Sequence, residues 1–184
     1  MPPQVSRLIL IGFLIGLVGC DSRVPMKTVE YVDLPRYMGD WYVIANIPTF
    51  IEKEAYNAME RYELSDDGSV ATTFTFNKGG FDGPVKTYQP TGYIVDKQSN
   101  ALWGMQFIWP LKGDFRIVYL DDDYQNTIIG REARDYVWIM SRQPQISDAD
   151  YKKLRNFIGS LGYDVNQLQK VPHKWERPIK DDAA

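Results

Sequence analysis

Short segments rich in β-branched and aromatic residues recur along this chain at regular intervals, and they constrain its fold more than any other feature. Turn signals such as Asp66-Asp67-Gly68 and Lys112-Gly113-Asp114 separate them. The expected strands span residues 40–47, 58–64, 69–76, 91–96, 101–109, 115–121, 126–132 and 135–142. The connections are too short for the crossovers that a parallel sheet needs. The sequence therefore predicts an all-β fold, an eight-stranded up-and-down antiparallel barrel.

After the last strand the apolar period changes from two to that of a helix. Ser147 is a suitable N-cap and Gly162 a suitable stop, so we predict one amphipathic helix over residues 148–161. Its apolar face consists of Tyr151, Leu154, Ile158 and Leu161. Val137 and Ile139 lie on the outward parity of the last strand, and we expect this helix to cover them rather than a second chain. Residues 164–171 are expected to add a short strand or a loose extension.

Several strands carry apolar residues on both faces, so both faces need cover: a helix on one side and the barrel interior on the other. The inward parity gives the candidate ligand-binding residues Glu60, Tyr62, Phe74, Phe76, Trp103, Met105, Phe107, Ile117, Tyr119, Tyr136, Trp138 and Met140. Large aromatic and methionine side chains can line a pocket or fill a core, and composition does not decide between the two. The loop over residues 48–57 is expected to overhang the mouth, with Phe50, Ile51 and Tyr56 as lid residues.

The N-terminus predicts export to a membrane. Arg7 precedes an apolar run over residues 8–18 that is too short to span a bilayer, and small Gly19 stands before Cys20, the only cysteine. The tetrad Leu17-Val18-Gly19-Cys20 resembles the bacterial lipobox, which implies that Cys20 is acylated and becomes the mature N-terminus. Two or three acyl chains anchor a protein stably. The expected organisation is a signal peptide over 1–19, an acylated tether over 20–33, a barrel with its helix over 34–175 and a tail over 176–184.

Three motifs in order resemble those of the lipocalins, and the bacterial outer-membrane group in particular, over residues 34–175. They are "GDWY" from Gly39 to Tyr42, "LDDDY" from Leu120 to Tyr124 and "WIMSRQP" from Trp138 to Pro144. The resemblance implies that Trp41 plugs one end of the barrel and that Arg142 packs across its ring. It also implies that Gly39, Asp123 and Tyr124 hold this end together rather than contact a ligand.

An apolar barrel interior suits a fatty acid, a lysophospholipid or a similar ligand, held for storage or transport in cell-envelope maintenance. Two alternatives stay open: a lipid-modifying enzyme with Glu60, the one inward acid, as its base, or an envelope scaffold with a filled barrel. One histidine, His173, and one cysteine argue against a metal site or a nucleophile–base pair, so we expect no enzyme activity and no cofactor.

The net charge of −3 argues against nucleic acid, and a homodimer stays possible. We expect the protein on the periplasmic side of the cell envelope. The resembling lipocalins favour the outer membrane, whereas an aspartate directly after the acylated cysteine, here Asp21, is typical of retention in the inner membrane of enteric bacteria.

Overall fold

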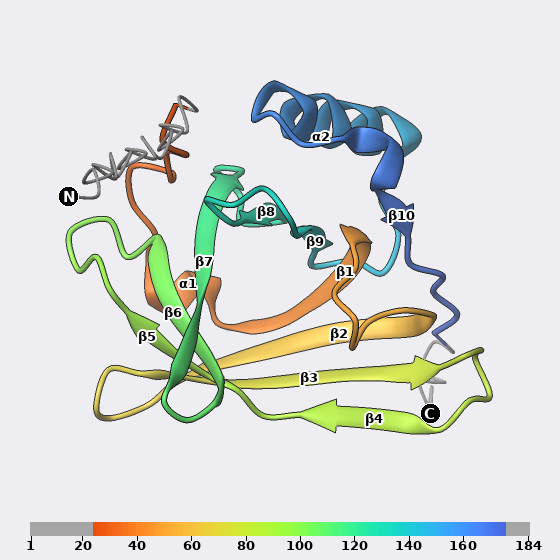
Figure 1. Ribbon diagram of the computed structural model, residues 1–184, viewed down its shortest axis with the longest axis horizontal. Helices are drawn as coiled ribbons and strands as arrows, with labels where there is room; N and C mark the ends of the chain where they lie inside the picture. The colour runs from red at the N-terminus through yellow and green to blue at the C-terminus, as the bar shows by residue number, and fades with distance from the viewer. Residues whose placement is uncertain (1–23, 176–184) are drawn as a thin grey trace, which may run out of the picture.

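The computed structural model describes residues 24–175, so the expected signal peptide, Cys20 and the tail over 176–184 lie outside the described residues. All strand pairs are antiparallel, and β1 pairs with both β2 and β9, which closes the sheet into a barrel (Figure 1). The strands are β1 (Gly39–Ile47), β2 (Ala55–Leu64), β3 (Val70–Lys78), β4 (Val85–Tyr88), β5 (Thr91–Ile94), β6 (Leu102–Ile108), β7 (Leu111–Leu120), β8 (Asn126–Gly130), β9 (Val137–Ser141) and β10 (Gln169–Lys170). The helices are α1 (Leu34–Tyr37), α2 (Asp148–Ser160) and the short 3₁₀ helix η1 (Val165–Gln167).

The eight-stranded barrel is confirmed, because β4 and β5 are two halves of one barrel strand. Both pair with β3, and Gln89 and Pro90 separate them. Proline has no N–H to continue a ladder, which explains the interruption. The sequence prediction missed β4, since its residues are mostly exposed and show no alternation. The short β10 extends the sheet beside β1.

Helix α2 packs outside the barrel, over β8 and β9 (Figure 1). Its predicted start is confirmed: the Ser147 hydroxyl accepts a hydrogen bond from the Asp150 N–H at 3.0 Å. Leu154 and Ile158 pack in one apolar cluster with Val137 and Ile139, and all four are buried. The helix therefore covers the outward face of β9, as expected.

Two β-bulges change which residues face α2. The β1 register shifts between Val43 and Ala45, and the β7 register shifts between Ile117 and Tyr119. An extra residue reverses the alternation beyond it. Tyr119 therefore faces outward, with its ring 5.4 Å from that of Phe157 in α2, and its expected place inside the barrel is wrong.

Much of the expected N-terminal tether lies against the barrel wall. The Val29 N–H donates to the Ile117 carbonyl at 2.9 Å, and the Val32 N–H donates to the Ser99 carbonyl at 2.7 Å. The side chain of Val32 is completely buried. Residues 24–33 therefore belong to the folded body, although their sequence has no strand or helix pattern.

The chain connections lie alternately at two ends of the barrel. Those over 48–54, 79–84, 109–110 and 131–136 meet at one end, which we call the open end. Those over 65–69, 95–101 and 121–125 meet at the other, the closed end, together with α1. Only the closed end is sealed by side chains.

Arg142 and Trp41 form the seal of the closed end. The guanidinium carbon of Arg142 lies 3.8 Å from the centroid of the fully buried Trp41 ring. The same guanidinium donates to the carbonyls of Arg36 and Asp40, each at 2.8 Å. Gly39 is required here, because it has φ +94° and a Cβ would come within 3.4 Å of Arg142. One side chain thus ties α1, β1 and β9 together.

Tyr124 and the neighbouring acids complete the closed end. The Tyr124 hydroxyl accepts the Asp33 N–H at 2.9 Å, and its ring lies under the Arg36 guanidinium. Asp123, expected to hold this turn, is exposed. The carboxylate that accepts from the turn belongs to Asp121, which binds the Gln125 N–H at 2.6 Å. The acid that holds this turn is therefore Asp121, two residues before the expected Asp123.

We expect Arg142→Lys to lower the free energy of unfolding by about 2 kcal/mol, because an ammonium cannot reproduce the planar, multiply donating fork over Trp41. Urea unfolding measures this. The control is Arg61→Lys, whose solvent-exposed ion pair with Asp40 should contribute clearly less than the contacts of Arg142. Equal losses in the two variants would contradict the assigned role of Arg142.

Candidate ligand-binding site

A cavity of about 340 Å³ occupies the open half of the barrel. Its wall includes seven of the residues expected from the inward parity: Glu60, Phe74, Met105, Phe107, Tyr136, Trp138 and Met140. Its mouth is formed by residues 49–52 before β2, by the β6–β7 hairpin and by the β8–β9 connection. The volume falls at the lower end of the range for ligand pockets and suits one narrow ligand.

Aromatic side chains fill the closed half and form the cavity floor. Trp103 and Phe115 are stacked with centroids 5.1 Å apart, and Tyr62 meets Trp103 edge-on at 5.7 Å. Tyr37, from α1, packs on Trp41 at 5.0 Å. The barrel is therefore filled at one end and hollow at the other.

Four more of the expected ligand-binding residues face inward but do not line the cavity. Tyr62, Trp103 and Ile117 are buried in the core cluster, and Phe76 is buried beside Tyr88, at 6.2 Å between ring centroids. Together with the outward Tyr119, these are the expected residues that the structure does not place at the cavity.

Glu60 is the acid at the inner part of the cavity, just above the floor. Its carboxylate accepts a hydrogen bond from the Tyr62 hydroxyl. Burial raises the pKa of Glu60 to about 7, and the negative charge of Glu52 adds to the rise, although the Tyr62 hydrogen bond opposes it. Burial also raises the pKa of Tyr62 well above its ordinary value. Near neutral pH the cavity therefore holds a carboxyl group that exchanges readily between its neutral and charged forms.

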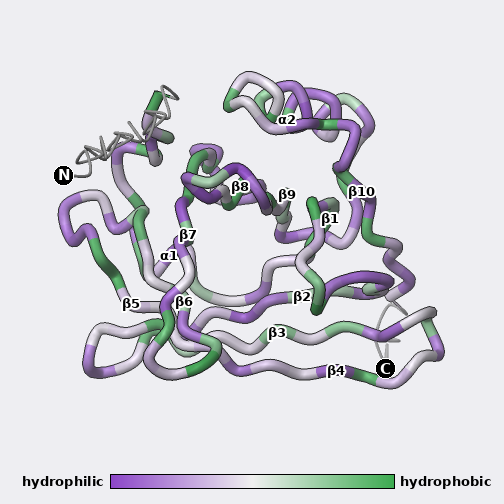
Figure 2. The backbone as a smooth tube through the Cα atoms, viewed as in Figure 1, coloured by the Kyte–Doolittle hydropathy of each residue, from purple (hydrophilic) through white to green (hydrophobic). Residues whose placement is uncertain are grey.

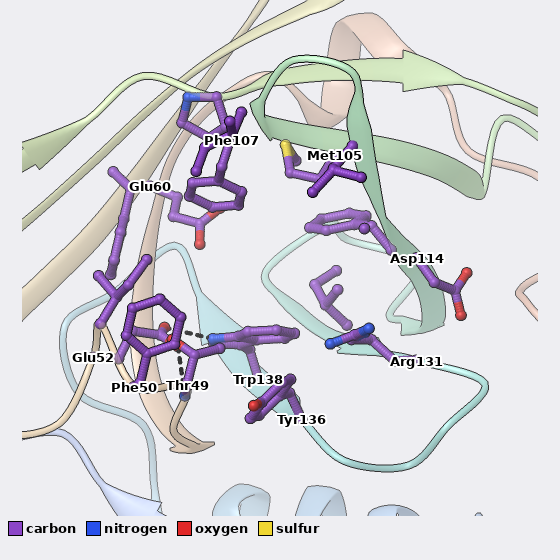
Figure 3. A pocket seen from close by; sticks show the side chains of 18 of the residues that line it. Thr49, Phe50, Glu52, Glu60, Met105, Phe107, Asp114, Arg131, Tyr136 and Trp138 are labelled. Carbon is purple, nitrogen blue, oxygen red and sulfur yellow. Dashed lines mark hydrogen bonds between the residues drawn. The ribbon is translucent and has the colours of Figure 1, made fainter.

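Glu52 fixes the loop at the mouth, and the sequence analysis did not identify it. Its carboxylate accepts from the Trp138 indole N–H at 2.6 Å and from the Thr49 N–H and hydroxyl at 3.1 and 2.8 Å (Figure 3). The residue is buried. These bonds tie the β1–β2 loop to β9 and hold the Trp138 ring in the cavity wall. Of the expected lid residues, Phe50 and Ile51 line the mouth, whereas Tyr56 packs on Phe81 outside it.

Arg131 is the cation of the cavity wall. In the view of Figure 3 it lies on the opposite side of Trp138 from Glu52. One terminal nitrogen pairs with the Asp135 carboxylate at 3.2 Å, while the Nε atom is buried and has no hydrogen-bond partner within the described residues. The available sequence signal was its parity in the strand expected over 126–132, because Arg131 alternates in phase with Ile129, which also lines the cavity. The Arg131 guanidinium puts a positive charge in an otherwise mostly apolar wall, which is suited to an anionic group of a ligand.

Within residues 24–175, no cluster of histidine, cysteine and acidic side chains has the arrangement of a metal site. No helix in this part of the chain has both the length and the hydropathy to cross a bilayer.

Solved structures define the class of fold. Insecticyanin from the tobacco hornworm Manduca sexta superposes with a TM-score of 0.65 and 14% identity, over 84% of this chain and 87% of that one. The cockroach allergen Per a 4 superposes with a TM-score of 0.62 and 17% identity, over 84% and 97%. The barrel with its single sealed end and outer helix thus has the same fold as these two proteins.

Sequence comparison then gives the family. The model of the lipocalin-like domain matches residues 32–173, and the chain belongs to this family. It is 32% identical to temperature-induced lipocalin-1 of Arabidopsis thaliana, over 88% of this chain and 90% of that protein. It is 31% identical to the outer membrane lipoprotein Blc of Citrobacter freundii, over 89% and 93%, and 30% identical to that of Escherichia coli K12, over 83% and 87%.

The raised pKa of Glu60 makes stability depend on pH. Between about pH 4.5 and 7 the unfolded chain ionises Glu60 while the folded protein keeps the proton, so the free energy of unfolding falls as pH rises through this range. Glu60→Gln should remove this fall and stabilise the protein above pH 7.

Urea unfolding at pH 4.5, 6 and 8 measures the effect, with the exposed Glu63→Gln as the matched control on the same strand. If Glu60→Gln leaves the pH profile unchanged, the pKa of Glu60 is the same in the folded and the unfolded protein, which contradicts its elevation by burial.

Proposed function

We propose that this protein is a membrane-anchored carrier that holds a single-chain lipid, such as a fatty acid or a lysophospholipid, in the open half of its barrel. It would store or transport such lipids in maintenance of the cell envelope. The observation that carries the proposal is the hollow, apolar half-barrel with one open mouth. Membership of the lipocalin-like family supports binding of an apolar ligand.

The cavity fits an acyl chain by shape and chemistry. Each buried methylene contributes about 0.8 kcal/mol, so an apolar wall gives useful affinity with few polar contacts. The aromatic floor limits how deep the chain can enter. The cavity volume also favours a carrier over a scaffold with a completely filled barrel.

Arg131 and Glu60, two of the titratable residues of the wall, suggest how the lipid is oriented. Arg131 stands at the mouth, and its guanidinium would bind the carboxylate or phosphate of the head group. Glu60 lies at the inner end, where its raised pKa favours the neutral form beside an apolar chain terminus. A ligand placed this way leaves by the mouth without moving a charge through the cavity.

Binding is preferred over catalysis because Glu60 has no suitable partner for chemistry. Its neighbour is a tyrosine whose pKa is raised, which disfavours a tyrosinate nucleophile. His173 is bonded through Nε2 to the Val43 carbonyl and through Nδ1 to Trp175, away from the cavity wall. The proposed function therefore requires only reversible binding of a ligand.

Palmitic acid should bind the processed protein with micromolar or tighter affinity, as measured by isothermal titration calorimetry and by the change in tryptophan fluorescence. We expect Arg131→Gln to weaken palmitic acid about tenfold and to leave hexadecanol nearly unchanged, because only the acid presents an anion. Arg61→Gln, at the closed end, is the matched control.

Absence of saturable binding by any single-chain lipid would refute the carrier function. An equal loss for palmitic acid and hexadecanol would instead refute the role of Arg131 as the head-group residue.

The anchor is proposed from Cys20, and the names of the bacterial relatives as outer membrane lipoproteins support it. Mass spectrometry of protein extracted from its own membrane should show a processed chain beginning with acylated Cys20. Cys20→Ser should release the protein from the membrane fraction. A chain that stays membrane-bound and unacylated after this substitution would show another mode of attachment.

Asp21 provides a test of which membrane is used. We propose that the protein is anchored in the outer membrane. Membrane fractionation of the wild type and of Asp21→Ser tests this assignment. Wild type in the inner membrane, with the variant moved to the outer membrane, would show that Asp21 retains the protein.

A further inference from the structure

Large apolar side chains are exposed together around the open end of the barrel. Phe50, Ile108, Trp109 and Leu111 are each at least 70% exposed, and Phe107 is half-exposed. We call these five residues the apolar rim. All but Trp109 also line the mouth of the cavity, so the rim and the cavity wall form one continuous apolar surface. Figure 2 shows the hydrophobic colouring of the turn between β6 and β7.

This surface is unlike the rest of the molecule. A monomeric protein in water seldom exposes several large apolar residues side by side, and such patches mark contacts with proteins or membranes. Acids occur at both ends, but Glu54, Glu132 and Asp135 of the open end each pair with a lysine or arginine. The loops of the closed end carry the larger group of acids, which comprises Asp66, Asp67, Asp96 and Asp121 to Asp123. A bilayer with anionic lipids attracts apolar and tryptophan side chains at its interface and repels carboxylates. The two ends of the barrel therefore have opposite affinities for such a surface.

The N-terminal segment leads to the same end. The Val24 carbonyl accepts a hydrogen bond from Arg134 at 2.7 Å, and the Met26 N–H donates to Glu132 at 3.2 Å. Both partners belong to the β8–β9 connection at the open end. Val24, the first described residue, is thus held beside the mouth. Cys20 stands four residues earlier in the sequence, a span of at most about 14 Å.

We propose that the apolar rim docks into the surface of the lipid bilayer, so that the open mouth of the barrel faces the membrane directly. The anchor at Cys20 holds the open end close to the bilayer, and the rim fixes its orientation. A lipid then passes between bilayer and cavity along an apolar path. This orientation goes beyond the proposed lipid binding, since a docked rim does not require an occupied cavity.

A fluorescent label at each end of the barrel tests the orientation. The full chain, processed and acylated, is reconstituted into vesicles of phosphatidylethanolamine and phosphatidylglycerol. Trp109→Cys at the rim or Lys97→Cys at the closed end carries a nitrobenzoxadiazole label, since the acylated Cys20 offers no free thiol. We expect a nitroxide-labelled lipid to quench the label at 109 at least threefold more strongly than the label at 97.

Equal, weak quenching at both positions would overturn the proposal, as would stronger quenching at 97. A blue-shifted label at 109 that the lipid nitroxide does not quench would show that the rim is covered by another protein or a second copy, which also overturns it. These readouts involve no bound ligand, so failure here and failure of palmitic acid binding are separate results.

Substitution of the rim itself gives the second measurement. Ile108→Ser with Leu111→Ser, added to the labelled Trp109→Cys chain, should reduce lipid quenching at least threefold. Both side chains are mostly exposed, so circular dichroism should be unchanged. The matched control is Val95→Ser, an exposed valine of the closed end, which should leave the quenching at 109 as it was. Undiminished quenching in the double variant would show that the rim does not hold the orientation.

Discussion

The pairing of β1 with β9 is the constraint on which the rest of this structure depends. An antiparallel sheet that stays open has two unpaired edges, and closing it removes both at the barrel seam. The seam alone would leave two holes, one at each end. Arg142 lies where the seam meets the closed end, and its contact with Trp41 and with the α1 carbonyls seals one hole. The asymmetry between a filled half and a hollow half follows from this seal.

Much of the fold could be predicted because barrel strands and α2 leave clear periodic patterns. The failures have definite physical causes. A bulge in β7 turned Tyr119 to the outside, and a bulge depends on pairing with β8, which one strand's sequence does not reveal. The packing of residues 24–33 depends on hydrogen bonds to the distant Ile117 and Ser99. Interactions of this kind lie beyond any local pattern.

The sequence predicted which side chains of the candidate site face the barrel interior, but not how far along the barrel axis each of them lies. Alternation showed that Glu60 and Tyr62 share a face, yet one lines the cavity and the other is part of its floor. Position along the barrel axis decides this, and it is set by α1 and the aromatic packing from several strands. Glu52 was missed because it lies in a loop, where no alternation applies. Arg131 lies near the end of the strand expected over 126–132, on the parity of Ile129, but as a lone cation it was not singled out. Both residues act through partners that lie close to them only once the barrel has closed.

The division of one strand into β4 and β5 has a consequence for the shape of the mouth. Above Pro90 the described ladder joins β4 to β3 only, whereas β5 continues the wall to β6. The wall beside the mouth is therefore not held by a continuous ladder around the full circumference. It can widen between β4 and β6 without breaking a backbone hydrogen bond of the barrel. The girth of the proposed ligand is thus set by side chains, which adapt, and the proposed carrier has the structural basis to take up apolar ligands of differing cross-section through a single entrance.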